Sequence, residues 1–389
     1  MEKLKLTDIC DFQGGSQPPK EQWTNELKDG YIRMLQIRDF TQGKNNNEYV
    51  KISNTLKTCE DDDILIARYG ASVGKVLSGL SGAYNVAIIK SIPDISKVLK
   101  RYLYYYFNTD YFQNRIKSVG SRAAQAGFNK TDLEDFEINI PSLIEQQKII
   151  EILDKSQELI KKRKEQIQAL DELVKSQFIE MFGAPINNPK SWDLTTMDKV
   201  IDVIGGYAFK STDFADDGIP VLKIGNINSG YFKPTNLMFW EKDDKLERYL
   251  IKPGDLVISL TGTVGKDDYG NVCIMGTDYD EYYLNQRNAK LEIKSTESFN
   301  KYYLTYLLKV PEIKQRLTGI SRGVRQANIS NKDILNLEVP NPPIELQNKF
   351  EEFVKQVDKL KFKMENSLKE LEDNFNSLMQ KSFKGELFN

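Results

Sequence analysis

The chain of 389 residues contains no histidine and three cysteines, Cys10, Cys59 and Cys273, which lie far apart. The absence of histidine excludes serine–histidine–aspartate triads, the common zinc sites and the usual general base near neutral pH. Cysteines without the close spacing of metal ligands are expected to be reduced and unreactive, which favours a cytoplasmic protein. We therefore expect no bound metal and no cofactor.

Long apolar runs are also missing. No stretch approaches the roughly 18 apolar residues of a membrane span, and Met1-Glu2-Lys3 does not open a signal peptide. Aromatic residues make up 11% of the chain, which is enough for hydrophobic cores. The length allows two domains of about 150 residues plus connecting helices. These features predict a two-domain protein outside the membrane.

Two glycine loops, residues 68–76 (RYGASVGKV) and 260–266 (LTGTVGK), resemble phosphate-binding loops. Such a loop has four residues between its first glycine and the Gly-Lys pair, followed by Ser or Thr. Only three residues separate Gly70 from Gly74, the second loop is shorter still, and Val76 replaces the hydroxyl. An acidic residue and an apolar run precede both loops, so the pattern indicates an internal repeat and argues against nucleotide binding.

The repeat extends along nearly the whole chain. Residues 29–43 (DGYIRMLQIRDFTQG) match 217–230 (DGIPVLKIGNINSG), and a Ser-Arg turn recurs at 121–133 (SRAAQAGFNKTDL) and 321–334 (SRGVRQANISNKDI). Matched positions are Gly14-Gly15 with Gly205-Gly206, Leu35 with Leu222, Asn85 with Asn285, Arg122 with Arg322, Gln125 with Gln326, and Asp132 with Asp333. Each unit is far longer than the roughly 20–50 residues of a solenoid repeat. The sequence therefore indicates a domain duplicated in tandem.

Each half ends in a segment with the apolar spacing of a coiled coil, at residues 141–183 and 342–388. The apolar positions are Ile149, Leu153, Ile160, Ile167, Leu170, Val174, Phe178 and Met181, and then Phe350, Val354, Val357, Met364, Leu368, Leu371, Phe375 and Leu378. Proline opens both segments, and each helix could span roughly 55–60 Å. Two long helices lying on their own domains are the alternative, but dense charge opposite the apolar stripe favours helix–helix pairing.

Two short motifs suggest catalysis, but both have simpler explanations. Residues 292–294 (EIK), with Asp280 upstream, faintly resemble the metal-binding core of a nuclease. The same triplet recurs within residues 311–314 (PEIK), and neither has a counterpart in the first half. Residues 341–344 (NPPI) resemble the Asn-Pro-Pro-aromatic motif of amino-methyltransferases. Ile344 replaces the aromatic residue, and no glycine-rich methyl-donor loop follows a strand. We expect no catalytic residues.

Basic and amide side chains recur in the Ser-Arg turns of both halves. The formal charge of −2 and the pI of about 5.7 argue weakly against nucleic acid, but acidic helices can mask basic loops. Arg, Asn and Gln carry the donors and acceptors that read guanine and adenine edges. Solvated surface charge is the alternative for any one arginine, and recurrence at one place in both copies favours a DNA-reading turn.

The chain resembles the specificity subunit of a Type I restriction–modification enzyme. The resemblance covers essentially the whole chain and depends on the GDLVISLTGTVGK-type loop, the S-R-x-x-x-Q/N…D-[LI] turn, and the proline-led Ile-Glu-x-Gln start of each long helix. Two departures from the pattern are a first glycine loop one residue longer than the second, and IEQQ in the first helix against IELQ in the second.

This resemblance implies a mixed α/β (α+β) fold with a pseudo-twofold internal repeat, in which two target recognition domains are separated by two long helices forming an antiparallel coiled coil. The expected boundaries are 1–141 for the first domain, 142–183 for the first helix, 184–340 for the second domain, and 341–389 for the second helix. In that family each domain reads one half of a split sequence in double-stranded DNA. The helices, called conserved regions, dock two methyltransferase subunits, restriction subunits complete the enzyme, and catalysis belongs to those other chains.

We expect the base-reading side chains on the Ser-Arg turns and phosphate contacts on the glycine loops. The candidate DNA-binding residues are Lys75, Arg122, Gln125, Asn129, Lys266, Arg322, Arg325, Gln326 and Asn328. Two similar but non-identical domains on a rigid spacer suit two half-sites, which recur every 34–36 Å or so on one face of a duplex. The alternatives are a non-DNA scaffold that presents two binding domains on a stalk, and a catalytic nuclease or methyltransferase.

Overall fold

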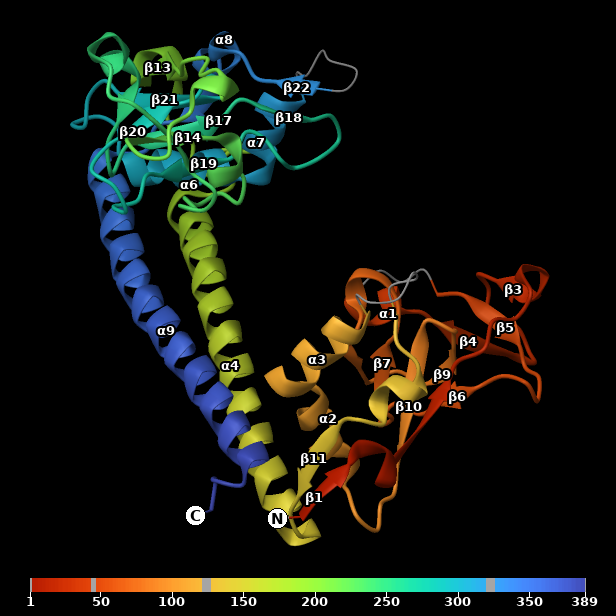
Figure 1. Ribbon diagram of the computed structural model, residues 1–389. Helices are drawn as coiled ribbons and strands as arrows, with labels where there is room; N and C mark the ends of the chain where they lie inside the picture. The colour runs from red at the N-terminus through yellow and green to blue at the C-terminus, as the bar shows by residue number, and fades with distance from the viewer. Residues whose placement is uncertain (1, 43–46, 121–126, 320–325, 389) are drawn as a thin grey trace. The chain divides into compact units, whose positions relative to one another are not determined.

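The computed structural model divides into two compact units, each with its own sheets and short helices (Figure 1). The first unit comprises Met1–Lys164 together with Asn366–Asn389, and the second comprises Glu165–Glu365. The structure describes residues 2–42, 47–120, 127–319 and 326–388. Two long helices each contribute residues to both units.

The first unit contains two sheets and one extra pair of strands. The strands are β1 (Glu2–Lys5), β2 (Cys10–Gly14), β3 (Trp23–Thr24), β4 (Tyr31–Leu35), β5 (Tyr49–Lys51), β6 (Thr58–Cys59), β7 (Leu65–Ala67), β8 (Val76–Leu77), β9 (Gly82–Tyr84), β10 (Ile88–Pro93) and β11 (Glu137–Ile140). The strand orders are β2-β10-β7-β8 and β3-β5-β4-β9-β6, and β1 pairs with β11. Only β4 and β9 run parallel among these described pairs.

The second unit repeats this plan. Its strands are β12 (Leu194–Thr196), β13 (Ile201–Gly205), β14 (Ile219–Leu222), β15 (Met238–Trp240), β16 (Leu250–Ile251), β17 (Leu256–Ser259), β18 (Thr261–Thr263), β19 (Val272–Ile274), β20 (Tyr282–Leu284), β21 (Asn288–Ile293), β22 (Gln326–Asn328) and β23 (Glu338–Pro340). The orders are β13-β21-β17-β19 and β15-β14-β20-β16, with the pairs β12-β23 and β18-β22. Parallel pairing recurs between β14 and β20. The shared topology confirms the predicted internal repeat.

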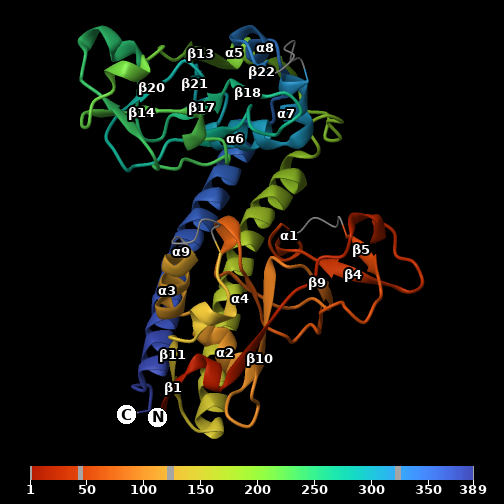
Figure 2. The ribbon, with the colours of Figure 1, turned by 45° about the vertical axis from the view of Figure 1, so that its right-hand side comes forward.

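Helices follow the same plan in both units, and all of them are visible in Figures 1 and 2. Their bounds are α1 (Ile37–Thr41), α2 (Lys100–Phe107), α3 (Asp110–Gly120), α4 (Leu143–Phe182), α5 (Met197–Val200), α6 (Lys301–Lys309), α7 (Pro311–Thr318), α8 (Asn331–Leu335) and α9 (Ile344–Lys384), with the 3-10 turn η4 at Lys130–Leu133. Within the described ranges, no helix is long and apolar enough to cross a membrane.

A buried tyrosine occupies the same place in each core. Tyr102 in α2 and Tyr303 in α6 are almost completely buried. The Tyr102 hydroxyl donates to the backbone carbonyl of Asn139 at 2.9 Å, and the Tyr303 hydroxyl donates to that of Pro340 at 2.8 Å. A buried hydroxyl needs such a partner, because desolvating an unpaired polar group is costly. Each tyrosine thus ties its helix to the last strand of its unit.

The matched glycine and asparagine positions mark a close backbone approach. A Cβ atom on Gly15 would lie 2.1 Å from the carbonyl oxygen of Asn85, and one on Gly206 would lie 2.3 Å from that of Asn285. Each asparagine side-chain oxygen accepts a hydrogen bond from the backbone amide two residues later, at 3.1 and 3.2 Å. These matched residues are therefore explained by packing, because no side chain fits at either glycine.

A buried glutamine explains the shared start of the long helices. Gln146 and Gln347 are fully buried. Their side-chain oxygens accept hydrogen bonds from the amides of Leu99 at 2.9 Å and Asn300 at 2.8 Å. Their side-chain nitrogens donate to the carbonyl of the proline five residues earlier. The structural counterpart of Gln347 is thus Gln146, whereas the Ile-Glu-x-Gln alignment in the sequence selects Gln147.

Helices α4 and α9 pack antiparallel. In the second unit, Phe178 near the end of α4 packs on Phe350 near the start of α9, with ring centroids 5.4 Å apart. In the first unit, Lys164 pairs with Glu372 at 2.7 Å. Every predicted apolar position is buried or half-buried, and the ends of both helices also join the domain cores. The predicted coiled coil is therefore confirmed, with additional contacts between each helix end and a domain.

Candidate nucleic-acid interface

The first glycine loop uses its backbone amides internally. After β7, the amide of Gly74 donates to the carbonyl of Ala67 at 2.9 Å, and the amide of Lys75 donates to Ser72 at 3.0 Å. A phosphate-binding loop needs such amides to point at the ligand. The loop is therefore a tight turn that presents the exposed side chain of Lys75, and the phosphate-loop interpretation has no geometric support.

The second glycine loop presents Lys266 beside two aspartates. The amide of Thr263 donates to the carboxylate of Asp268 at 2.7 Å, which lowers the pKa of that carboxyl group. Asp267 forms an ion pair with Lys314. Both carboxylates thus have partners inside the domain, while the Lys266 side chain is exposed. Lys266 remains a candidate phosphate contact, next to two carboxylates that are already paired within the domain.

Four of the candidate base-reading residues lie outside the described residues. These are Arg122 and Gln125 in the first Ser-Arg turn, and Arg322 and Arg325 in the second. Gln326 is placed only as the first residue of β22. The described part of each turn begins at Gly127 and at Gln326.

The first Ser-Arg turn is joined directly to the first glycine loop. Tyr69 forms an antiparallel bridge with Gly127. The Arg68 guanidinium donates through Nε to the carbonyl of Phe128 at 3.1 Å, and through Nη2 to Oδ1 of Asn129 at 2.6 Å. Asn129 is exposed and caps η4, where its backbone N–H donates to Oδ2 of Asp132 at 2.7 Å. The structure therefore places Asn129 next to the loop that carries Lys75.

The second Ser-Arg turn meets the second glycine loop through a short β-ladder. Strand β18 pairs antiparallel with β22, with Thr261 opposite Asn328 and Thr263 opposite Gln326 (Figure 1). Next to the ladder, the amide of Ile329 donates to the carbonyl of Leu260 at 2.8 Å. Asn328 is exposed. In both units, the described end of the Ser-Arg turn, with Asn129 in one and Asn328 in the other, therefore adjoins the glycine loop that carries the exposed lysine.

Arg68 is the residue that sequence comparison missed. Its counterpart in the second unit is Leu260, which is 8% exposed and belongs to the core. A comparison of the two copies selects positions that match, so it does not select Arg68 as a candidate DNA-binding residue. The available signals were its place directly before Tyr69-Gly70 and the matched Gly14, whose Cβ would lie 3.1 Å from Nη1 of Arg68.

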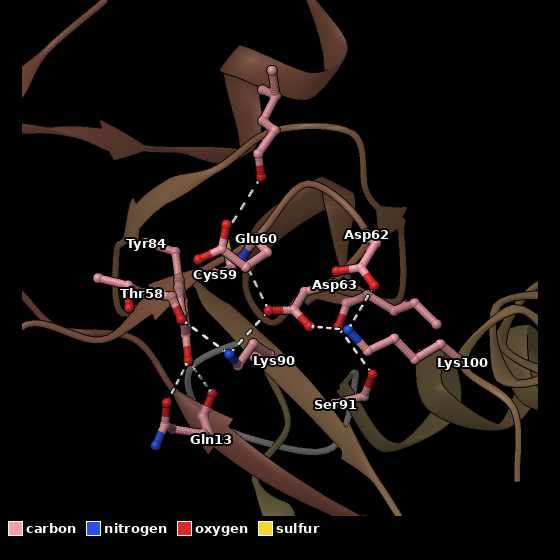
Figure 3. Close-up of polar contacts among 12 residues, drawn as sticks. Gln13, Thr58, Cys59, Glu60, Asp62, Asp63, Tyr84, Lys90, Ser91 and Lys100 are labelled. Carbon is pink, nitrogen blue, oxygen red and sulfur yellow. Dashed lines mark hydrogen bonds and ion pairs between the residues drawn. The ribbon is translucent and has the colours of Figure 1, made fainter. Parts of the chain in front are cut away.

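The acidic residue before each glycine loop is structural. Asp63 is 8% exposed and accepts hydrogen bonds from Lys90 at 3.0 Å and Lys100 at 2.9 Å (Figure 3). Burial acts to raise the pKa of Asp63, but the bonds from Lys100, the Glu60 amide and Lys90 outweigh it and hold the pKa below its ordinary value. In the second unit, Asp255 pairs with Lys290 at 3.3 Å. These lysines stabilise the folded units, which removes them as candidates for phosphate contacts.

The two motifs that suggested catalysis also have structural partners. Glu292 and Lys294 lie on β21 and just after it, where Glu292 pairs with Lys290 at 3.1 Å and Lys294 with Asp202 at 3.4 Å. In the NPPI segment, the Asn341 side chain accepts a hydrogen bond from Gln347 at 3.3 Å. Within the described ranges, no group of three or more His, Cys, Asp or Glu residues could hold a metal ion. The triplet and the NPPI segment are thus accounted for by strand and helix-start contacts.

Comparison with known proteins shows similarity along both halves. A family model described as the Type I restriction modification DNA specificity domain matches residues 1–169 and 189–373. The Type I restriction enzyme MjaVIII specificity subunit of Methanocaldococcus jannaschii is 26% identical over 382 residues, covering 92% of this chain and 86% of its own. The EcoKI specificity subunit of Escherichia coli is 21% identical over 398 residues, covering 95% and 85%.

Two solved structures share the fold. One, from a study of complex assembly and conformational transition of the type I R-M system, aligns with a TM-score of 0.61 at 18% identity and covers 99% of this chain and 98% of its own. The other is the S subunit of a Type I restriction-modification system from M. genitalium, with a TM-score of 0.53 at 17% identity and coverage of 98% and 96%.

Proposed function

The chain belongs to the family of type I restriction-modification DNA specificity proteins, and we propose that each of its units reads one half of a split DNA target. It is a sequence-specific DNA-recognition subunit, as are the relatives it matches. The observation that carries the proposal is the duplicated junction between glycine loop and Ser-Arg turn. One scaffold carries different side chains in its two copies, as two different half-sites require.

The side chains at the junction suit a division between phosphate and base contacts. Lys75 and Lys266 are exposed lysines, each on the glycine loop beside the Ser-Arg turn of its own unit, which favours phosphate contacts that position the protein on DNA. The Ser-Arg turns supply the base contacts, through Arg122, Gln125 and Asn129 in one unit and Arg322, Arg325, Gln326 and Asn328 in the other. A bidentate Arg or Gln contact discriminates between bases by about 1–3 kcal/mol.

We also propose that catalysis resides in partner chains. The relatives are named specificity subunits of type I restriction enzymes, so methyl transfer and ATP-driven cleavage are assigned to methyltransferase and restriction subunits in the cytoplasm. The duplication offers two similar docking surfaces, hence two methyltransferase subunits. Exposed apolar residues on the long helices support docking there: Leu159 is 47% exposed, Leu173 46% and Phe362 63%.

A domain exchange tests the proposal. Residues 1–140 are replaced by those of a relative, the chimera is assembled with its methyltransferase subunits, and methylated genomic DNA is sequenced. One half of the target should change while the other half stays the same. A simultaneous change in both halves would show that the two units read jointly.

The purified chain alone distinguishes the alternatives. Without methyltransferase subunits it should transfer no methyl group and cleave no DNA. Methylation or cleavage by the chain alone would establish a catalytic enzyme. An assembled complex that binds no specific duplex would favour a scaffold protein instead.

A further inference from the structure

Arg68 makes a set of contacts that fixes the described part of the first Ser-Arg turn. Its own amide donates to the carbonyl of Ala87 at 2.8 Å, which holds its backbone beside β10. Its side chain donates to the Phe128 carbonyl at 3.1 Å and to Asn129 Oδ1 at 2.6 Å. One residue thus connects the end of β7 to two successive residues of the turn.

The packing around Arg68 leaves little freedom. Its guanidinium lies 5.1 Å from the ring centre of Tyr69, a distance at which cation–π attraction stabilises the pair. A Cβ atom on Gly127 would come within 2.3 Å of the Tyr69 ring, and one on Gly14 within 3.1 Å of the guanidinium. Two glycines therefore make room for the Tyr69–Arg68 stack.

The guanidinium also determines the orientation of the Asn129 amide. A guanidinium has donors and no acceptor, so it can bond only the oxygen of an asparagine side chain. With Oδ1 bonded to Arg68, the opposite group, the Nδ2 donor, is the one available for an outside acceptor. Asn129 is exposed, so this donor is accessible.

We propose that Arg68 is a positioning residue for the first half-site, and that it presents Asn129 to DNA as a hydrogen-bond donor. This inference rests on the proposed function. A donor suits the acceptor atoms of the major groove, which are guanine N7 and O6, adenine N7 and thymine O4. The bidentate contact to adenine uses both ends of the amide, and it is disfavoured because Arg68 already occupies one of the two lone pairs of the oxygen. In the second unit, the β18–β22 ladder takes the place of the Arg68 contacts.

The experiment uses the assembled enzyme with its methyltransferase subunits. The target is first determined from methylated genomic DNA. Fluorescence anisotropy then measures the Kd for the cognate duplex, for duplexes with either half-site scrambled, and for single base-pair changes in the first half. Thermal melting of each variant reports the integrity of the fold.

Arg68→Leu introduces the residue of the second copy and should weaken cognate binding about tenfold, which is the order of the loss expected when one base contact is removed. Discrimination against the duplex with a scrambled first half should fall by the same factor, while discrimination at the second half is unchanged. Arg68→Lys retains one donor and should recover part of the loss. Arg115→Leu is the matched control, because Arg115 also stacks on a ring, that of Phe136 at 4.9 Å, and should change neither half-site.

Asn129→Asp separates the two parts of the proposal. Aspartate keeps the oxygen for Arg68 and the helix cap but removes the amide donor. This variant should melt like the wild type and lose preference at one base pair of the first half. Asn129→Ala should lose that preference and also weaken binding to the whole first half.

Several outcomes would overturn the inference. Wild-type affinity in Arg68→Leu would remove the positioning role, and so would equal loss at both half-sites. An Asn129→Asp enzyme with unchanged base preference would remove the donor role. A wild-type complex that ignores both half-sites would overturn the proposed function itself, which distinguishes the two failures.

Discussion

Among the described residues, the first Ser-Arg turn meets its glycine loop through one backbone bridge, Tyr69 with Gly127, and the side chain of Arg68, whereas in the second unit a ladder of two short strands makes the connection. A strand ladder consists of backbone hydrogen bonds, so it constrains the turn almost independently of side-chain identity. The Arg68 contacts depend on one residue and on the glycines that make room for it. The first turn should therefore be more sensitive to substitution than the second.

The rest of the two scaffolds differs much less. The buried glutamine, the buried tyrosine and the ion-paired aspartate occur in both units with the same types of partner. These groups are removed from water and must have hydrogen-bond partners, so a change at one of them destabilises the fold. The junctions are more exposed, and different residues can fulfil the same role there. The comparison indicates that the two copies diverged at the junctions between glycine loop and Ser-Arg turn, which we propose as the contacts with each unit's own target.

The largest effect is expected from altering the helix pair that both units share. Four residues inserted into α4 near Lys162 would shift the downstream part of the helix by roughly 6 Å and break the apolar register. Specific binding should be lost, or the spacer between half-sites should lengthen, with the bases of each half unchanged.

Seven inserted residues preserve the heptad register and shift the helix by roughly 10 Å, so this variant should bind a target with a longer spacer. The same four residues inserted after Leu27, which is 70% exposed, provide the control. The target is read from methylated genomic DNA. An enzyme with the four-residue helix insertion that kept the original spacer and full affinity would contradict the role of the helices in setting distance.

Substitution of the two buried glutamines should show equal effects in the two units. Gln146→Leu or Gln347→Leu leaves a backbone amide and a carbonyl without partners, which should lower the free energy of unfolding by about 2–3 kcal/mol. Gln147→Leu is the control, because Gln147 is exposed and bonds only to Glu151 in the described structure. Calorimetry measures the three variants. A large effect in only one unit would mean that the helix starts are not equivalent.

Loss of a base-reading arginine should affect one half-site at a time. Arg122→Ala should relax the first half-site and Arg322→Ala the second, each by about 1–3 kcal/mol. Anisotropy with half-site variants measures this for the assembled enzyme. If the double variant bound its specific target like the wild type, the assignment of the Ser-Arg turns to DNA reading would be wrong.

The smallest effect is expected at the two lysines of the glycine loops. Lys75→Ala and Lys266→Ala should weaken binding to all sequences alike, and each should reduce the slope of log K against log salt by about 1. Lys266 lies among engaged carboxylates, so its effect should be the smaller. A titration of binding against salt tests both. A change in base preference in either variant would move that lysine from phosphate contact to base reading.

The sequence alone determined the features that depend on periodicity and on recurrence. The apolar spacing of the long helices, the tandem repeat and the family resemblance are all readable from one dimension, because a 3.6-residue period and a recurring motif are properties of the chain itself. The correspondence of Gly15 with Gly206 is also readable from the sequence, because both copies have glycine there. The physical reason is that a side chain at either position would meet a backbone carbonyl.

Tertiary structure alone decided which residues meet across the chain. Arg68 and Asn129 are far apart in sequence, and their contact depends on how β7 and η4 pack. The same holds for Gln146, whose equivalence to Gln347 follows from hydrogen bonds to the residues before α2 and α6. A hydrogen bond depends on distance and angle in three dimensions. Arg68 and Leu260 differ between the copies, so no repeated motif in the sequence indicates the contact that Arg68 makes.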